Sequence, residues 1–222
     1  MKGNKFWLAS NSPRRREILT WAGWRLEKVS SNGDEAMLAL EPPEHYVQRI
    51  AELKSRVNLK EALEHDFVIS ADTIVVHNGK ILGKPKDPGD AFEMLVSLRG
   101  GEHWVMTALA VRHAGAEKAR LELCKSKVRM RRYSNEEIRK YVDSGDPLDK
   151  AGAYAIQDRG FHPTEDFRGC IASVMGMPLC HLERLLRRSQ DYEWTDWPSI
   201  CQKKLEYSCP ITSRVIAGED IG

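Results

Sequence analysis

The stretch "DFVISADTIVVHNGKILGKP", residues 66–85, decides the fold because it predicts two strands joined by a tight turn. Residues 67–71 form an apolar run that is typical of a buried strand. An Asn-Gly pair at 78–79 separates two further apolar runs, which is the strongest short signal for a β-hairpin. We expect Asp72 and Thr73 where the first strand ends, which is where α/β folds tend to bind ligands.

Helical and extended patterns alternate on both sides of this hairpin. Apolar residues recur at helical spacing over residues 12–23, 42–65, 87–100, 134–145 and 177–188. Short or alternating apolar runs predict strands over residues 5–10, 24–30, 102–115, 118–133 and 169–176. The alternation predicts an α/β fold with a mixed sheet, whereas the tail of the chain shows no clear period.

Three of the predicted helices carry start signals or a long apolar face. Ser12 is a plausible N-cap for the first helix. Ser134 with Glu137 three residues later forms a capping box. In the helix predicted over 42–65, the apolar positions continue as far as Leu63.

The composition is that of an ordinary soluble globular protein. The 222 residues are 41% hydrophobic and 30% charged, with a net charge of +2, so electrostatics give no case for nucleic-acid binding. No apolar run approaches the roughly 20 residues of a membrane span, and the N-terminus lacks a secretory apolar region. Five cysteines, an odd number, argue against a disulfide scaffold. We therefore expect a cytoplasmic protein with no nucleic-acid or membrane partner.

The segment "SNSPRR", residues 10–15, is a candidate anion site because a strand is followed by a turn and a helix N-terminus. Ser10 and Ser12 add hydroxyl groups, and Arg14 and Arg15 add guanidinium groups that suit phosphate. The alternative is a capped helix with solvated arginines, and from this segment alone the two interpretations are evenly balanced.

Two further clusters contain chemistry-bearing residues. Asp72 could hold Mg²⁺ or accept a proton from water, although an aspartate in a turn between strands is the commoner case. Lys84 lies between Gly83 and Pro85, so its backbone is constrained and its ammonium could meet a phosphate. Lysines such as Lys54 on a helix are usually only solvated. No Walker or G-x-G-x-x-G motif occurs, so phosphates would have to be held in another way.

Four motifs together give the chain a family resemblance. The segments "LASNSPRRREIL", "ADTIVVHNGKILGKPKD", "AFEMLVSLRGGEHWVMTALAV" and "YVDSGDPLDKAGAYAIQ" occur in order and resemble the Maf family of nucleoside triphosphate pyrophosphatases. The resemblance implies a mixed, elongated sheet flanked by helices, with two lobes around a deep substrate cleft. It also implies cleavage of a nucleoside triphosphate to the monophosphate and pyrophosphate with Mg²⁺ or Mn²⁺, and a cytoplasmic location.

The resemblance also implies roles for individual residues. Asp72 matches the carboxylate that accepts the proton, and Glu35 matches an acidic residue that, with Asp72, helps to bind the metal. Residues that match the family's substrate-binding positions are Ser10, Ser12, Arg14, Arg15, Lys54, Thr73, Lys84, Lys150 and Gln157. In the stretch "LDKAGAYAIQ", residues 148–157, Lys150 is expected to close the cleft and Gln157 to reach the base.

Arg14, Thr73 and Gln157 match positions that separate the subfamilies by base preference. In this respect the sequence resembles the subfamily that hydrolyses dTTP and UTP. Two alternatives stay open: a pyrophosphatase for a modified purine nucleotide such as 7-methyl-GTP, and a non-catalytic nucleotide-binding regulator of cell division. We expect the catalytic domain to cover residues 1–188 and an extension of unknown role to cover 189–222; a homodimer is also left open.

Overall fold

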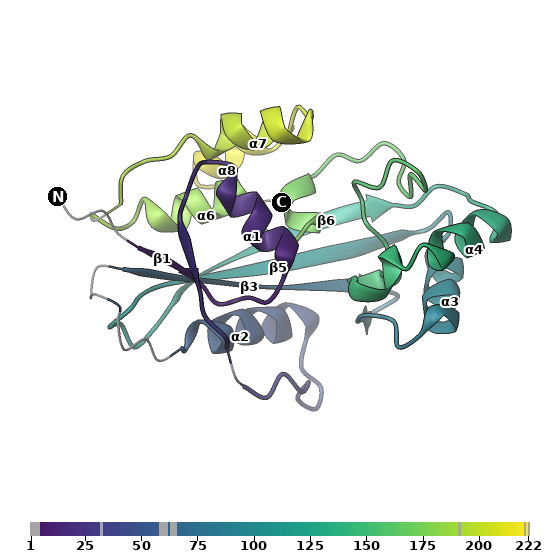
Figure 1. Cartoon of the computed structure of the whole chain (residues 1–222), viewed down its shortest axis with the longest axis horizontal. Coiled ribbons are helices and arrows are strands. Elements are labelled where there is room, and N and C mark those ends of the chain that lie inside the picture. The colour runs from purple at the N-terminus through teal and green to yellow at the C-terminus, as the bar shows by residue number, and fades with distance from the viewer. Residues whose placement is uncertain are drawn as a thin grey trace.

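The molecule is built on an elongated mixed sheet of six strands (Figure 1). The computed structural model describes residues 5–31, 33–57, 62, 66–190, 192–219 and 221. The strands are β1 (Phe6–Leu8), β2 (Leu26–Lys28), β3 (Phe67–His77), β4 (Lys80–Leu82), β5 (Glu102–His113) and β6 (Arg120–Arg129). Their order is β2-β1-β3-β5-β6, with β4 also paired to β3. β1 runs parallel to β2 and β3, and the other pairs are antiparallel, which confirms the predicted mixed α/β sheet.

The predicted hairpin is confirmed, but its first strand is longer than expected. Asn78 and Gly79 both have positive φ and form the turn between β3 and β4. β3 does not end before Asp72, as the apolar run predicted, and Asp72 lies in its middle. The reason is pairing: β5 is in register with β3 from Phe67 to Val76, so backbone hydrogen bonds continue past the polar residues.

Helices cover both faces of the sheet and one end of it. They are α1 (Pro13–Thr20), α2 (Pro43–Ser55), α3 (Pro88–Leu98), α4 (Asn135–Asp143), α5 (Ile171–Val174), α6 (Leu179–Leu186), α7 (Trp197–Leu205) and α8 (Thr212–Ile216), with 3₁₀ turns η1 (Asp146–Asp149) and η2 (Ala151–Ala153). In Figure 1, α2 lies on one face, α1 and α6 lie on the other, and α3 and α4 lie together at the far end of the long strands. No helix in the described segments is long and apolar enough to cross a membrane.

Local signals explain several of these helix ends. Ser134 and Glu137 form the predicted capping box at the start of α4. α2 ends at Ser55, earlier than predicted, because Arg56 leaves the helical conformation. The end of the predicted helix, including Leu63, lies outside the described residues.

The strand predicted over residues 169–176 is wrong, because this segment forms the short helix α5. A short apolar run cannot by itself distinguish a strand from a buried helical turn. Here Cys170 caps the turn by accepting a hydrogen bond from the Ser173 amide (3.3 Å), and Gly176 ends it with φ of 96°. α5 then packs on β5, where the Thr107 hydroxyl donates to the Ser173 carbonyl (2.8 Å).

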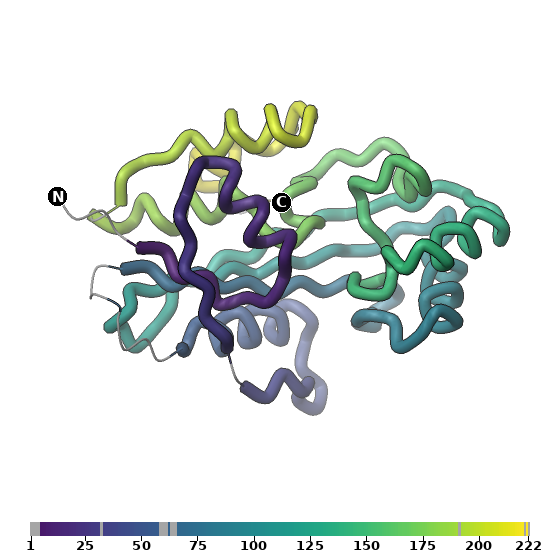
Figure 2. The backbone as a smooth tube through the Cα atoms, viewed as in Figure 1, coloured from purple at the N-terminus to yellow at the C-terminus, as the bar shows by residue number. Residues whose placement is uncertain are grey.

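The C-terminal tail packs on the same hydrophobic core as the first strands. Trp197, at the start of α7, is fully buried in a cluster that includes Leu8 and Ile18. Its ring meets the ring of Trp24 edge to face, with centroids 4.8 Å apart. Figure 2 shows α7 on the same side of the sheet as α1. The division at residue 188 stays a prediction.

Candidate active site

A cavity of about 480 Å³ lies at a gap in the edge of the sheet. On one edge β3 pairs with β5 along almost its whole length. On the other edge it pairs with β1 over Phe67–Ile69 and with β4 over Val75–His77. In the described part of the chain, residues 70–74 have no strand partner on that second edge. The cavity occupies this gap, so the middle of β3 forms its floor.

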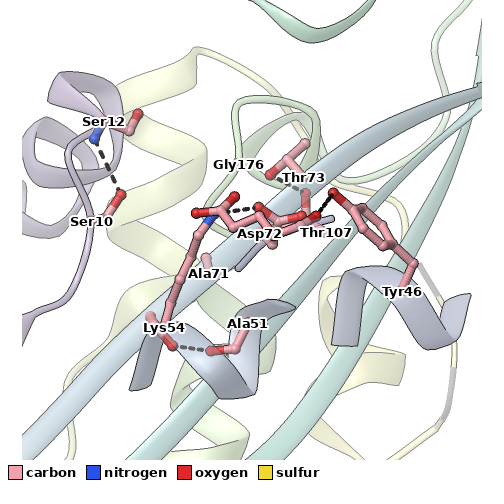
Figure 3. A network of polar contacts seen from close by, with 12 residues as sticks. Ser10, Ser12, Tyr46, Ala51, Lys54, Ala71, Asp72, Thr73, Thr107 and Gly176 are labelled. Atoms are coloured by element: carbon pink, nitrogen blue, oxygen red, sulfur yellow. Dashed lines mark hydrogen bonds and ion pairs between the residues drawn. The ribbon is translucent and has the colours of Figure 1, made fainter. Parts of the chain in front are cut away.

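Successive residues of β3 face opposite sides of the sheet, as the pleat requires. Ile74 packs with α2 residues such as Ala51, and Asp72, two positions earlier, points to the same side. Thr73 points to the other side, where it meets Thr107 (Figure 3). The cavity therefore has an acidic wall on the α2 side and a wall of hydroxyl and apolar groups on the other.

Glu35, Lys54 and Asp72 meet on the acidic wall. The Lys54 ammonium contacts the Asp72 carboxylate at 2.8 Å (Figure 3) and the Glu35 carboxylate at 2.9 Å. Asp72 and Lys54 are largely buried, whereas half of the Glu35 side chain is exposed. α2 is held against β3 one turn before Lys54, because the Ser70 hydroxyl donates to the Ala51 carbonyl (2.6 Å).

This donor set fits a divalent cation that is shared with a substrate. The carboxylates of Glu35 and Asp72 both contact the Lys54 ammonium, so two anionic groups lie on the same wall of the cavity. No group of three or more His, Cys, Asp or Glu side chains able to hold a metal occurs among the described residues. Mg²⁺ is commonly bound by only one or two carboxylates, with phosphates and water completing its shell.

The Arg15 side chain forms its hydrogen bonds with other groups of the protein. Its guanidinium donates to the carbonyls of Ala71 (2.8 Å) and Gly176 (2.9 Å) and to the hydroxyl of Thr73 (2.9 Å). Burial lowers the pKa of Arg15, and the nearby charge of Asp72 opposes that shift. The sequence predicted the presence of Arg15 in the cleft but not these partners.

Arg14, Ser12 and Lys84 line the same cavity with their polar groups available. Within the described segments, the side chains of these three residues make no hydrogen bond or ion pair. Lys84 is exposed, and its neighbour Gly83 accepts a backbone hydrogen bond from Gly152 (3.0 Å), which fixes this segment beside η2. These side chains can therefore bind an anion without breaking existing contacts.

The two remaining predicted residues are placed differently. Lys150 lines the cavity, but its buried ammonium already donates to the Asp146 and Asp149 carboxylates (2.8 and 2.7 Å) and to the Asp146 carbonyl. All three of its N–H groups are thus used within the loop. Gln157 is exposed and is absent from the cavity wall, so the structure does not bring it to the other site residues.

Two tyrosines in the cavity wall escaped the sequence analysis. The Tyr46 hydroxyl donates to the Glu35 carbonyl (3.1 Å), and Tyr46 lies about two turns before Lys54 on the same helix face. The Tyr154 hydroxyl contacts His103 Nε2 (2.7 Å), and burial lowers the pKa of His103 to about 3, so this imidazole is neutral. Only the helical spacing of Tyr46 could have signalled its position.

The other end of the cavity is apolar, and it lies on the Thr73 side of β3. Its wall contains Val75, Leu82, Val105, Tyr154, Val174 and Met175. A cavity with charged groups at one end and apolar and aromatic groups at the other suits a ligand with a phosphate chain and a flat ring system.

Comparison with known proteins gives a consistent result. The family model described as Maf-like protein matches residues 5–189. A dTTP/UTP pyrophosphatase of Shewanella denitrificans is 43% identical over 195 residues, covering 85% of this chain and 98% of that protein. Proteins of the same name from Anaeromyxobacter dehalogenans (46% identity; 82% and 92% covered) and Neisseria meningitidis serogroup B (41%; 83% and 93%) are also similar. The match extends over both walls of the cavity, and the chain belongs to the Maf family.

Proposed function

We propose that this chain hydrolyses nucleoside triphosphates, with dTTP and UTP preferred, to the nucleoside monophosphate and pyrophosphate. The observation that carries the proposal is the meeting of Glu35, Lys54 and Asp72 at the open edge of β3. The names of the similar proteins support the same activity. We also propose that residues 1–188 form the catalytic unit. We propose a cytoplasmic location for the protein.

The phosphates are assigned to the polar end of the cavity. The free N-terminus of α1 and the side chains of Ser12 and Arg14 face it from one side, and Lys84 faces it from the other. Backbone N–H groups and cations together favour a chain of negative charge. The base then lies toward Val75 and Tyr154, where apolar contacts dominate.

In this arrangement Asp72 acts as the general base. One of its oxygens accepts a hydrogen bond from Lys54, and no hydrogen bond or ion pair engages the other within the described residues, so the second oxygen is available to a water molecule. As the water oxygen bonds to the α-phosphorus, Asp72 accepts its proton; the bond from the α-phosphorus to the bridging oxygen breaks and pyrophosphate leaves. A divalent cation held by Glu35 and Asp72 together with the phosphates would neutralise charge on the leaving group.

The first test is pyrophosphate release with and without a divalent cation. The wild-type chain should turn over dTTP many times per molecule with Mg²⁺ or Mn²⁺. Chelation should abolish turnover, because Lys54 balances only one of the two carboxylates and the cluster would then present a net negative charge to the triphosphate. Readdition of the metal should restore turnover. A single stoichiometric signal would contradict the proposal and favour a nucleotide-binding regulator. Full activity in excess chelator would contradict the role assigned to the divalent cation.

The second test is base preference. At fixed Mg²⁺ we expect higher kcat/KM for dTTP and UTP than for 7-methyl-GTP, ATP and GTP, because a base site that fits one ring penalises bases of another size or with another hydrogen-bonding edge. Gln157→Ala serves as an internal comparison. Gln157 is exposed outside the cavity. If the ratio of kcat/KM between pyrimidine and purine nucleotides is unchanged in this variant, residues of the cavity wall select the base. If the ratio is smaller, the Gln157 segment closes over the base. A preference for 7-methyl-GTP would refute the pyrimidine assignment.

A further inference from the structure

We infer that Arg15 is a positioning residue rather than a phosphate ligand: through a partly buried network it aims the hydroxyl of Ser10 at the phosphates. The network consists of Ser10, Arg15, Thr73 and Thr107, with the carbonyls of Ala71, Ser173 and Gly176. The inference rests on the proposed function, since it assigns the phosphates to this end of the cavity.

Arg15 takes the place of a missing strand at the gap in the sheet. Its Nη1 donates to the Ala71 carbonyl (2.8 Å), a group on the edge of β3 that β1 and β4 both leave uncovered. The same nitrogen donates to Ser10 Oγ (3.3 Å), and Nε donates to the Gly176 carbonyl (2.9 Å). One side chain thus ties the loop after β1, the middle of β3 and the turn after α5 together.

The hydroxyl protons of Thr73 and Thr107, on the far side of the Arg15 guanidinium, already form hydrogen bonds within the protein. Thr107 donates its single proton to the Ser173 carbonyl (2.8 Å). The bond between the Thr73 and Thr107 hydroxyls (2.9 Å) must therefore use the proton of Thr73. Thr73 also accepts a hydrogen bond from Arg15 Nη2 (2.9 Å), so its hydroxyl has no proton left for a substrate.

The hydroxyl proton of Ser10, in contrast, is not used in a hydrogen bond to the described residues. Its oxygen accepts hydrogen bonds from the Ser12 amide (3.2 Å) and from Arg15 Nη1, which occupies both of its acceptor positions. Its own proton has no acceptor among the described residues, and the side chain lines the cavity. Phosphate oxygens accept hydrogen bonds, so a phosphate in this cavity would supply the acceptor that the Ser10 proton lacks.

Gly176 gives independent support, because it leaves space for the guanidinium. A Cβ at this position would lie 3.1 Å from Thr73 Oγ1 and 3.3 Å from Arg15 Nε. Gly176 also has φ of 96°, a conformation that favours glycine. The chain offers a matched control: Gly218 has φ of 99°, but a Cβ there would meet none of the described residues within 4 Å.

The first experiment is a double-mutant cycle on Ser10→Ala and Arg15→Lys. Pyrophosphate affinity with Mg²⁺ is measured by calorimetry and kcat/KM is measured with dTTP. Ser10→Ala should weaken both by about 10- to 100-fold, the effect of losing one hydrogen bond to a charged group. Arg15→Lys keeps the charge but loses the fork geometry, so it should cost about as much. The double variant should be no more than about threefold worse than Arg15→Lys alone, because coupled residues are not additive.

The variants Gly176→Ala and Gly218→Ala repeat the test without changing any charged residue. Gly176→Ala should lower kcat/KM by about 10-fold or more, and adding Ser10→Ala to it should lower kcat/KM little further. Gly218→Ala should keep kcat/KM within about twofold of the wild-type value. The same comparison applies if Arg15→Lys fails to fold, since Gly176→Ala keeps every hydrogen-bonding group of the network.

Independent, multiplicative effects of Ser10→Ala and Arg15→Lys, or equal activities of Gly176→Ala and Gly218→Ala, would overturn the inference. So would a wild-type protein that binds no pyrophosphate. A different result would contradict the proposed function: a wild-type protein that binds pyrophosphate but releases none from any nucleoside triphosphate. In that case the double-mutant cycle measured by pyrophosphate affinity still tests the network.

Discussion

Asp72→Asn is expected to lower turnover of dTTP by at least ~100-fold, the usual contribution of a general base. The amide cannot accept the proton of the attacking water, yet it has nearly the same volume and can still accept the hydrogen bond from Lys54. Lys54 also keeps Glu35 as its ion-pair partner, so the thermal midpoint should change little. Turnover is measured as pyrophosphate release at saturating dTTP, and folding is measured by thermal unfolding of the same preparation.

Asp143→Asn is the matched control for this prediction. Asp143 is an exposed carboxylate at the end of α4 and does not line the cavity, so its conversion to the amide should leave turnover within about twofold. A folded Asp72→Asn protein with near-normal turnover would remove Asp72 from the catalytic role. It would also direct attention to Glu35, the other carboxylate on Lys54.

Trp197→Ala is expected to destabilise the whole catalytic unit by about 3–5 kcal/mol, the usual cost of truncating a buried aromatic side chain. Trp197 is 0% exposed and packs with Trp24 and Leu8, so its removal leaves a cavity between the tail and the first strands. For a chain of this size the thermal midpoint should fall by roughly 6–20 °C. Urea unfolding measures the free energy, and residual pyrophosphatase activity after each incubation reports on the cavity at the sheet edge.

Trp194→Ala separates packing from the mere loss of a tryptophan in the tail. The Trp194 side chain is 59% exposed, and its ring contacts the Arg187 guanidinium at 5.5 Å. Loss of such an exposed cation–π contact should cost about 0.5–1 kcal/mol. If Trp197→Ala were no more destabilising than Trp194→Ala, the tail would be an appendage that the remainder of the chain does not need.

Local sequence was sufficient for features that depend on neighbouring residues. The turn at 78–79 forms because Asn and Gly tolerate positive φ, and the capping box at Ser134 forms because both partners lie within one helical turn. The alternation of helical and extended patterns predicted the mixed α/β sheet, since each period reports which face of an element is buried. The four motifs likewise pointed to the family to which the chain belongs.

Other features were decided by contacts between residues far apart in the chain. Pairing with β5 extended β3 past Asp72, where the local apolar run had ended. Packing on β5 made α5 a helix, although the isolated segment resembled a strand. Burial of Trp197 against Trp24 ordered a tail with no sequence period.

The roles of the site residues depended on tertiary structure most of all. From sequence, Arg14 and Arg15 were both candidate phosphate ligands at a helix N-terminus, and Lys54, Lys84 and Lys150 were all candidate substrate-binding residues. The fold leaves Arg14 and Lys84 available, places Lys54 between two carboxylates, and uses the donors of Arg15 and Lys150 within the protein. Sequence alone determined which charged groups the chain has and which secondary structures carry them. Only the folded chain decided which of them remain available to a substrate, because hydrogen-bond partners are set by distances between segments that no local pattern records.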